Sequence, residues 1–213
     1  RIDTPAMWNG TAFQTIGTFS DTRWADRFVT WDPDNAGPIA PRLVAAGLVG
    51  GNLPTGAGQG IIQLVNNEWT TFGATPNILA ATTFGNRLVV GGQIHMIAAN
   101  PANPFLALDA ANLAAWDGYE VTSFGNVSGT VRALKSFTNT AFPPQRDLYV
   151  AGTFGGVASP GAVGFTVNNI ARYSENAPDR GGGILPPGWF TMGQGFNSSV
   201  HALERFNSAT YAG

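Results

Sequence analysis

The sequence predicts an all-β fold built from repeated four-stranded antiparallel units, and three observations lead to this prediction. The chain carries 28 glycines and 14 prolines, spread along its length without a collagen period, as in folds with many short elements and turns. Short runs of alternating apolar residues lie between these turn residues and suit half-buried strands. Two sequence landmarks also recur four times in the same order. We therefore treat residues 1–213 as a single domain or as one segment of a larger one.

The first landmark is an apolar run that closes on a glycine. It reads R-D-L-Y-V-A-G-T-F from Arg146, R-L-V-A-A-G-L from Arg42, R-L-V-V-G-G-Q from Arg87, and S-A-T-Y-A-G at the end of the chain. The closing glycines lie about 45 to 60 residues apart, and a repeat period is expected to end near each of them. They are Gly47, Gly92, Gly152 and Gly213.

The second landmark is an apolar residue followed by glycine at the end of an aromatic segment. It ends at Gly17, Gly73, Gly125 and Gly193. Further pieces recur between the landmarks: N-L-A-A-W-D-G corresponds to N-I-A-R-Y-S, and V-R-A-L-K-S-F corresponds to V-H-A-L-E-R-F. The W-N-G and W-D-G stretches predict hairpin turns, because Asn or Asp followed by Gly accepts positive φ. Each period is thus expected to hold the strands V-x-A-L, L-Y-V-x-G, N-I-A-x-W and W-x-x-x-G.

Four antiparallel strands in such a period are typical of a β-propeller blade. The chain opens with the last two strands of a period and ends with the first two. Placed side by side, these ends would complete one shared blade and give about four blades, as a small ring or as part of a larger propeller. A β-helix would also repeat, but its coils are usually shorter and hold about three strands.

A family resemblance rests on the stretches L-Y-V-A-G-T-F, N-N-I-A-R-Y, W-F-T-M-G and V-H-A-L. They resemble kelch-type propeller repeats, and more closely the divergent kelch-like repeats of bacterial surface and secreted proteins. The resemblance covers most of the chain, although only Gly91-Gly92 matches the family's glycine pair and D-R-F-V-T-W-D-P-D departs from the pattern. It implies a tight backbone turn at the strand glycine and aromatic packing between blades.

Composition excludes several classes of partner and chemistry. A net charge of −2 without a Lys/Arg cluster argues against nucleic acid and against electrostatic membrane binding. No apolar run approaches the roughly 20 residues of a spanning helix, so no membrane span is predicted. With no cysteine, disulfides and thiolate chemistry are excluded. The low charge and the Asn, Thr and Gly content favour an extracellular or cell-surface location, and the chain, which starts at Arg1, is expected to be processed or partial.

No catalytic constellation is predicted. The chain has no G-x-S-x-G, no H-E-x-x-H and no Walker loop, and P-T-G-A-G-Q-G at 54–60 lacks the required Lys and Ser/Thr. Kelch-type copper oxidases need a cysteine crosslink and several histidines, which this chain lacks. His95 is expected in a loop and His201 on a strand of another blade, facing away from the apolar side, so both suit surface or hydrogen-bonding roles. The protein is therefore expected not to be an enzyme and to need no cofactor.

One acidic turn is a candidate for calcium. Asp32, Asp34 and Asn35 lie ahead of a glycine, and calcium prefers oxygen ligands at such spacing. Leu43 occupies the position at which a calcium loop needs a further acidic ligand. A turn built from Asp, Pro, Asn and Gly explains the same stretch without a metal, and we favour it.

Candidate ligand contacts lie in loops that interrupt the repeat. The segments 94–111 and 175–187 are predicted to be long, irregular loops, where repeat proteins often carry binding sites. They supply Phe105, Asp179 and Arg180, and Trp24 joins them because no other repeat has its counterpart. The remaining tryptophans recur at landmarks and are expected to pack between blades. These are Trp8, Trp31, Trp69, Trp116 and Trp189.

The function predicted from these features is a non-enzymatic interaction or structural module at the cell surface or outside the cell. Fold alone does not give function, and three alternatives stay open. One is a carbohydrate-binding propeller, which predicts exposed aromatic residues in its loops. Another is a segment of a larger propeller enzyme whose catalytic residues lie elsewhere. The third is an assembly subunit, self-associated or completed by another chain through open strand edges.

Overall fold

Every secondary-structure element of the described residues is a β-strand, so the all-β prediction is confirmed. The computed structural model describes residues 5–17, 25, 27–47, 60–74, 77–94, 96–100, 103–109, 111–139, 144–177, 184–206 and 209–213. Within these ranges no helix is long and apolar enough to cross a membrane.

Three sheets hold four antiparallel strands each, joined side by side in chain order, with one short strand added to the third. The first sheet contains β3 (Arg27–Trp31), β4 (Arg42–Gly47), β5 (Gly60–Val65) and β6 (Glu68–Ala74). The second contains β7 (Ile78–Phe84), β8 (Arg87–Gly92), β11 (Leu113–Trp116) and β12 (Val121–Ser123). The third contains β13 (Asn126–Asn139), β14 (Gln145–Ala158), β16 (Ile170–Ser174) and β17 (Gly188–Thr191), with β15 (Phe165–Thr166) paired to β14.

Two-stranded hairpins flank this series. The N-terminal hairpin consists of β1 (Ala6–Trp8) and β2 (Phe13–Thr15), and the C-terminal hairpin consists of β18 (Leu203–Phe206) and β19 (Ala209–Ala212). A third hairpin, β9 (Met96–Asn100) and β10 (Asn103–Asp109), is inserted between β8 and β11. The segment 94–111, expected to be an irregular loop, thus contains two paired strands.

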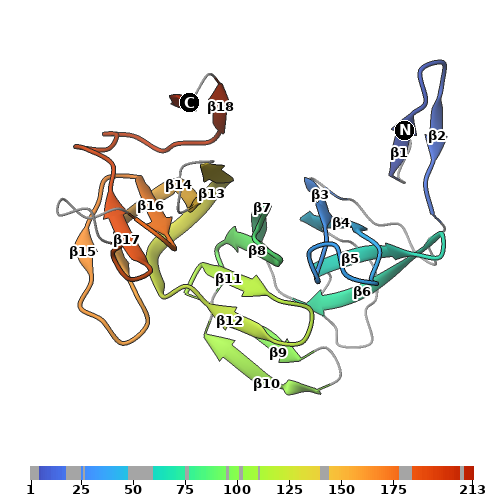
Figure 1. The fold of residues 1–213 in the computed structure, drawn as a ribbon, viewed down its shortest axis with the longest axis horizontal. Helices are drawn as coiled ribbons and strands as arrows, with labels where there is room; N and C mark the ends of the chain where they lie inside the picture. The colour runs from blue at the N-terminus through green and yellow to red at the C-terminus, as the bar shows by residue number, and fades with distance from the viewer. Residues whose placement is uncertain are drawn as a thin grey trace.

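The three sheets follow one another along the molecule in chain order (Figure 1). Their first strands are neighbours, since β3 contacts β7, β7 contacts β13, and β13 contacts β18 of the C-terminal hairpin. The two largest hydrophobic clusters lie between successive sheets, one joining the first to the second and the other joining the second to the third. Burial between sheet faces is the dominant favourable contribution to stability in such an arrangement.

The landmark glycines allow neighbouring strands of one sheet to approach closely. A Cβ at Gly92 would overlap the carbonyl oxygen of Asn77, and a Cβ at Gly152 would overlap that of Thr130. Neither glycine has a positive φ, so the requirement is for space rather than for an unusual backbone conformation. The recurring glycine of the sequence therefore has the same physical cause in two different sheets.

An asparagine at the start of the third strand ties each of two sheets to the segment that follows. Asn112 accepts a hydrogen bond from the backbone N–H of Ile94 (3.0 Å) and donates one to the carbonyl of Val127 (2.8 Å). Asn169 does the same with the N–H of Phe154 (3.1 Å) and the carbonyl of Phe196 (2.8 Å). Both residues have positive φ, which asparagine tolerates better than most residues. We call Asn112 and Asn169 the asparagine clamps.

A tryptophan on the last strand of a sheet makes a second recurring contact. The Trp69 indole donates to the carbonyl of Ile16 (2.7 Å), and the Trp189 indole donates to the carbonyl of Phe124 (3.2 Å). Ile16 and Phe124 both immediately precede a glycine of the second landmark. The same bond thus joins the first sheet to the N-terminal hairpin and the third sheet to the second.

An aromatic cluster fills the space between the second and third sheets. The Phe84 ring meets Phe124 at 5.8 Å and Tyr173 at 6.1 Å, both edge-on, and Tyr173 meets Trp189 at 5.5 Å. Burial in this cluster raises the pKa of the Tyr173 hydroxyl. The Arg87 guanidinium lies over Phe84 and pairs with Glu175, which also binds Arg146. Aromatic packing between sheets, expected from the resemblance, is present at this junction.

The two ends of the chain do not share a sheet in this structure. The terminal hairpins form separate two-stranded sheets, and Figure 1 places them at opposite ends of the series. Trp8 is 56% exposed, which corrects the expectation that it packs between blades, because no further strand among the described residues pairs with its hairpin. The other landmark tryptophans are buried, apart from the partly buried Trp116.

Candidate functional site

A cavity between the first and second sheets is lined by aromatic, charged and amide side chains. Its volume is about 340 Å³, near the lower end of the roughly 300–1,000 Å³ usual for small-molecule sites. The β3–β4 loop and the β11–β12 turn supply most of its wall, and strands β3, β4, β5 and β11 supply the rest. It is lined by Trp31, Pro33, Asp34, Ile39, Arg42, Gln63, Trp116, Gly118 and Tyr119.

Three aromatic side chains of different exposure line this cavity. Trp31 is fully buried and its indole donates to the carbonyl of Asn86 (2.6 Å), which fixes the ring. Trp116 is partly buried and packs against the same hydrophobic cluster. Tyr119 is 82% exposed, the most exposed aromatic residue described. The cavity therefore combines a rigid aromatic floor with a solvent-facing ring at its rim.

The β11–β12 turn holds the Tyr119 backbone in place. The Asp117 carboxylate accepts the N–H groups of Tyr119 (2.8 Å) and Glu120 (2.9 Å), an Asx-type turn. Gly118 has φ of +107° at the tip, and a Cβ there would come within 3.3 Å of Pro33 on the first sheet. The W-D-G hairpin prediction is confirmed at this turn, which also brings the two sheets together at the cavity rim.

The polar groups of the cavity carry one positive and one negative charge. Arg42 donates from Nη1 to the side-chain oxygen of Gln63 (2.9 Å), and no carboxylate in the described part of the chain pairs with it. Most of its N–H donors are therefore available to a ligand. Asp34 accepts the N–H of Ile39 through Oδ2 (2.9 Å).

The predicted acidic turn forms part of the same wall. Asp32 accepts the N–H groups of Asp34 and Ala36, each at 3.2 Å, so its carboxylate stabilises the turn. The Ala36 hydrogen bond is the main reason that the pKa of Asp32 lies below 3.8. Asn35 and Ala36 adopt positive φ. Among the described residues no group of three or more acidic or histidine side chains is arranged to hold a metal, and the observed hydrogen bonds fit the turn interpretation.

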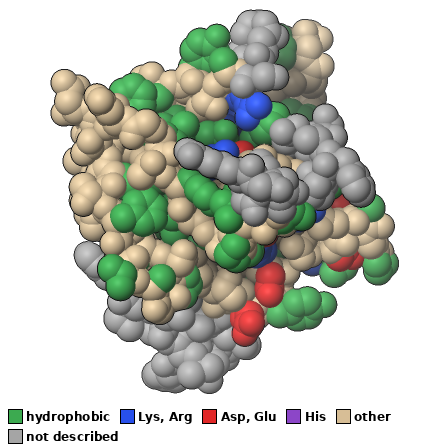
Figure 2. Space-filling model, turned by 60° about the vertical axis from the view of Figure 1, so that its left-hand side comes forward, with side chains coloured by type: hydrophobic (Ala, Val, Ile, Leu, Met, Phe, Trp, Pro, Cys, Tyr) green, Lys and Arg blue, Asp and Glu red, His purple; other side chains and the backbone are tan. Residues whose placement is uncertain are grey.

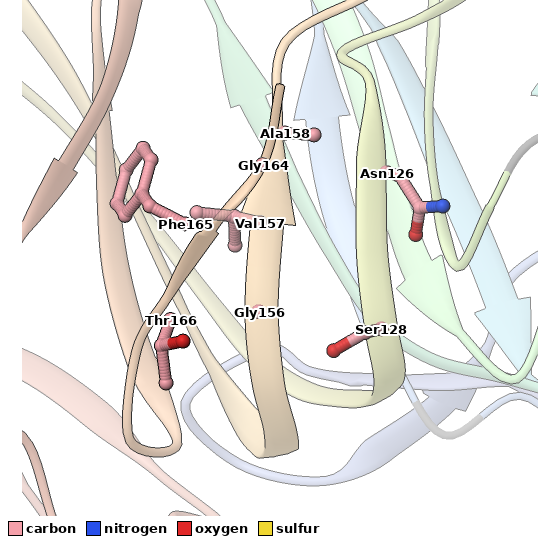
Figure 3. A pocket seen from close by; sticks show the side chains of 8 residues that line it. All are labelled: Asn126, Ser128, Gly156, Val157, Ala158, Gly164, Phe165 and Thr166. Atoms are coloured by element: carbon pink, nitrogen blue, oxygen red, sulfur yellow. The ribbon is translucent and has the colours of Figure 1, made fainter. Parts of the chain in front are cut away.

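A second cavity, of about 410 Å³, lies on the third sheet (Figure 3). Figure 3 shows β14 in the middle, with Asn126 and Ser128 on β13 to one side and Phe165 and Thr166 on β15 to the other. No ionisable side chain is among its lining residues. On this side of the molecule, charged side chains are few and hydrophobic ones are scattered among polar ones (Figure 2). The site offers shape and neutral hydrogen-bonding groups, but little chemistry to select a ligand.

A third cavity, of about 260 Å³, lies where the first strands of the three sheets meet the C-terminal hairpin. Arg27, Arg132 and His201 are among its lining residues. The exposed His201 agrees with the expectation that it faces away from the apolar side. Arg27 donates to the carbonyl of Leu79 (3.1 Å) and Arg132 to the hydroxyl of Thr153 (3.2 Å), so both side chains have structural partners.

The structure does not test whether the predicted ligand residues lie together. Trp24, Asp179, Arg180 and His95 lie outside the described residues, and Phe105 belongs to β10. Tyr119, Arg42 and Gln63 were missed by sequence reasoning. The sequence did contain a signal for Tyr119, because the residue after an Asp-Gly turn stands at a hairpin tip.

The chain was compared with known protein families, curated proteins and solved structures. No known protein family, curated protein or solved structure matches the chain.

Proposed function

We propose that the chain is a non-enzymatic interaction or structural module, built on a β-propeller of kelch-like blades and acting at the cell surface or outside the cell. The observation that carries the proposal is the series of three four-stranded sheets whose first strands are neighbours. In a propeller, the first strands line the centre and the loops between strands form binding surfaces.

The recurring contacts support this proposal. The asparagine clamps join successive units through the same backbone atoms, and the Trp69 and Trp189 bonds recur at equivalent landmarks. Blades that are related by the same rotation need the same contacts at each interface between neighbours. The interaction role follows from the cavity between two blades, which has fixed aromatic and polar groups and no nucleophile–base pair among its lining residues.

The two terminal hairpins correspond to the two halves of one four-stranded blade. The N-terminal hairpin receives the Trp69 bond at Ile16, as the last strands of the second sheet receive the Trp189 bond at Phe124. It therefore corresponds to an outer half. The C-terminal hairpin packs beside β13 through Leu203 and corresponds to an inner half. An isolated two-stranded hairpin is at best marginally stable in water, so each half favours pairing with the other.

A designed disulfide tests the proposed blade. In the third sheet Tyr149 pairs with Arg172, and the equivalent pair across the terminal hairpins is Thr210 with Met7. The second sheet has the same register. Residues directly opposite in a sheet have Cα atoms about 4.5–5.5 Å apart, within disulfide range. Because the chain has no cysteine, the double variant Met7→Cys/Thr210→Cys contains only the two designed thiols.

The expected result is rapid oxidation to one defined disulfide. A cross-linked monomer of 22.3 kDa means that the chain closes its own ring, and a cross-linked dimer means that two copies complete each other's blades. The control variant Met7→Cys/Tyr211→Cys moves one thiol to the opposite face, since side chains alternate along a strand, and it should cross-link slowly. Equal and slow cross-linking of both variants would overturn the propeller proposal.

Carbohydrate binding is the second candidate function. The observation that favours it is the inter-sheet cavity, where an exposed tyrosine adjoins an arginine, a glutamine and an aspartate.

A further inference from the structure

We propose that the cavity between the first and second sheets is a binding site for an uncharged saccharide of one or two sugar rings. The inference rests on the proposed role as a binding module, but it does not depend on closure of the ring. Tyr119 would stack on the sugar, and Arg42, Gln63 and Asp34 would bind its hydroxyl groups.

The aromatic side chains account for the apolar face of the ligand. One face of a pyranose ring presents several C–H groups, and the negatively polarised face of an aromatic ring attracts them. Tyr119 is 82% exposed although its backbone is held by the Asp117 turn, so the ring is available without rearrangement of the turn. Trp116 and Trp31 line the same cavity and would exclude water from beneath the bound sugar.

The polar side chains account for the hydroxyl groups. A sugar hydroxyl both donates and accepts hydrogen bonds, so it needs partners of both kinds. Arg42 supplies donors, the Asp34 carboxylate supplies acceptors, and the Gln63 amide supplies both. The Arg42–Gln63 bond of 2.9 Å holds these two side chains together before any ligand arrives, which lowers the entropy lost on binding.

Charge and size narrow the ligand class. Arg42 and Asp34 line the cavity with one charge of each sign, so neither an acidic sugar nor a cation gains a net attraction there. A volume of about 340 Å³ suits one or two rings and leaves longer glycans to extend into solvent past Tyr119. The overall charge of −2 disfavours nucleotides, whose phosphates need a basic surface.

The test is a titration of the whole chain with single, neutral saccharides. Hexose and N-acetylhexosamine mono- to tetrasaccharides are added one at a time, and binding is followed by calorimetry and by tryptophan fluorescence. At least one neutral saccharide is expected to bind with a Kd below about 1 mM and to change the fluorescence, because Trp31 and Trp116 line the cavity. An oligouronate of equal length should bind at least about tenfold more weakly.

Three variants locate the binding. Tyr119→Ala should weaken it roughly tenfold or more while leaving the fold intact, since that side chain is 82% exposed. Gln63→Ala should weaken it several-fold. The matched control is Tyr211→Ala, which removes another exposed tyrosine far from the cavity and should leave the affinity unchanged.

Each contrary outcome overturns the inference. If no neutral saccharide binds, uncharged sugars are not the ligand of this cavity. If the oligouronate binds more tightly than the neutral saccharides, the ligand class is acidic sugars instead. If the Tyr119→Ala variant binds the saccharide as tightly as the wild type, the cavity is not the binding site. A designed disulfide that forms while no saccharide binds would leave the propeller proposal standing and refute this inference alone.

Discussion

Alanine substitution at two glycines of one strand should have opposite effects on stability. Gly152 and Gly155 both lie on β14, and neither has a positive φ. A Cβ at Gly155 would have no heavy atom within 4 Å, whereas a Cβ at Gly152 would overlap the carbonyl oxygen of Thr130. The same substitution therefore separates the entropic effect of a methyl group from its steric effect.

The expected magnitudes follow from these surroundings. Gly155→Ala should stabilise the protein by about 0.4–1 kcal/mol, because alanine restricts the unfolded chain. Gly152→Ala forces β13 and β14 apart, at a cost of about 1–3 kcal/mol for overpacking. The displacement also strains two hydrogen bonds of 3.0 Å, from the Gly152 N–H to Asn169 and from the Val200 N–H to the Gly152 carbonyl, worth roughly 1 kcal/mol each. The two variants should differ by about 3–6 kcal/mol.

Thermal unfolding followed by circular dichroism measures the difference. At roughly 2–4 °C per kcal/mol for a chain of this size, the two melting temperatures should lie about 6–24 °C apart, with Gly152→Ala the lower. Urea denaturation supplies the free energies for comparison. Melting temperatures that agree within about 2 °C would refute the argument that strand contact determines the landmark glycine.

Three further substitutions test other parts of the structure. Phe84→Ala empties the centre of the aromatic cluster and should cost about 3–5 kcal/mol in urea denaturation, whereas an effect below about 1 kcal/mol would mean that the second and third sheets do not pack as described. Asn169→Ala removes one clamp and should speed amide exchange at Phe154, whose N–H loses its acceptor, while Asn168→Ala should leave that amide protected. The Lys135 ammonium donates to Glu204 and holds the pKa of that carboxyl below 4.5, so the ion pair stabilises the folded state above that pH and is lost on acidification. The stability difference between the wild type and Glu204→Gln should therefore shrink as the pH falls from 7 to 3, and a difference that grows would contradict the pairing.

The third sheet is the part of the fold that the sequence predicted best. Its four strands carry the alternating pattern and begin at, or directly after, an Asn, Gly or Pro, so local sequence determines where they begin. The hairpin turns at Asn9-Gly10 and Asp117-Gly118 were predictable for the same reason, since both glycines need positive φ. By contrast, β9 and β10 were missed, because Asn100, Pro101, Asn103 and Pro104 interrupt the apolar residues of that segment and leave no clear period.

The cavity could not be predicted from local pattern. Arg42 and Gln63 lie on adjacent strands of one sheet, while Trp116 and Tyr119 come from another, and only the packing of the two sheets brings them together. The exposure of Trp8 was missed for a related reason. Its sequence context matches that of the half-buried Trp116, but the burial of an aromatic residue depends on the neighbour that covers it.

The asparagine clamps have a consequence for how far such a sequence can diverge. Both clamps bind main-chain atoms alone, and every residue other than proline offers the same N–H and carbonyl groups. The side chains at Ile94, Val127, Phe154 and Phe196 are thus free to change without breaking a clamp. Units joined in this way can lose almost all resemblance to one another, and to units in other proteins, while their backbones keep the same geometry. In each of the two clamped sheets, one side-chain amide makes both of these bonds.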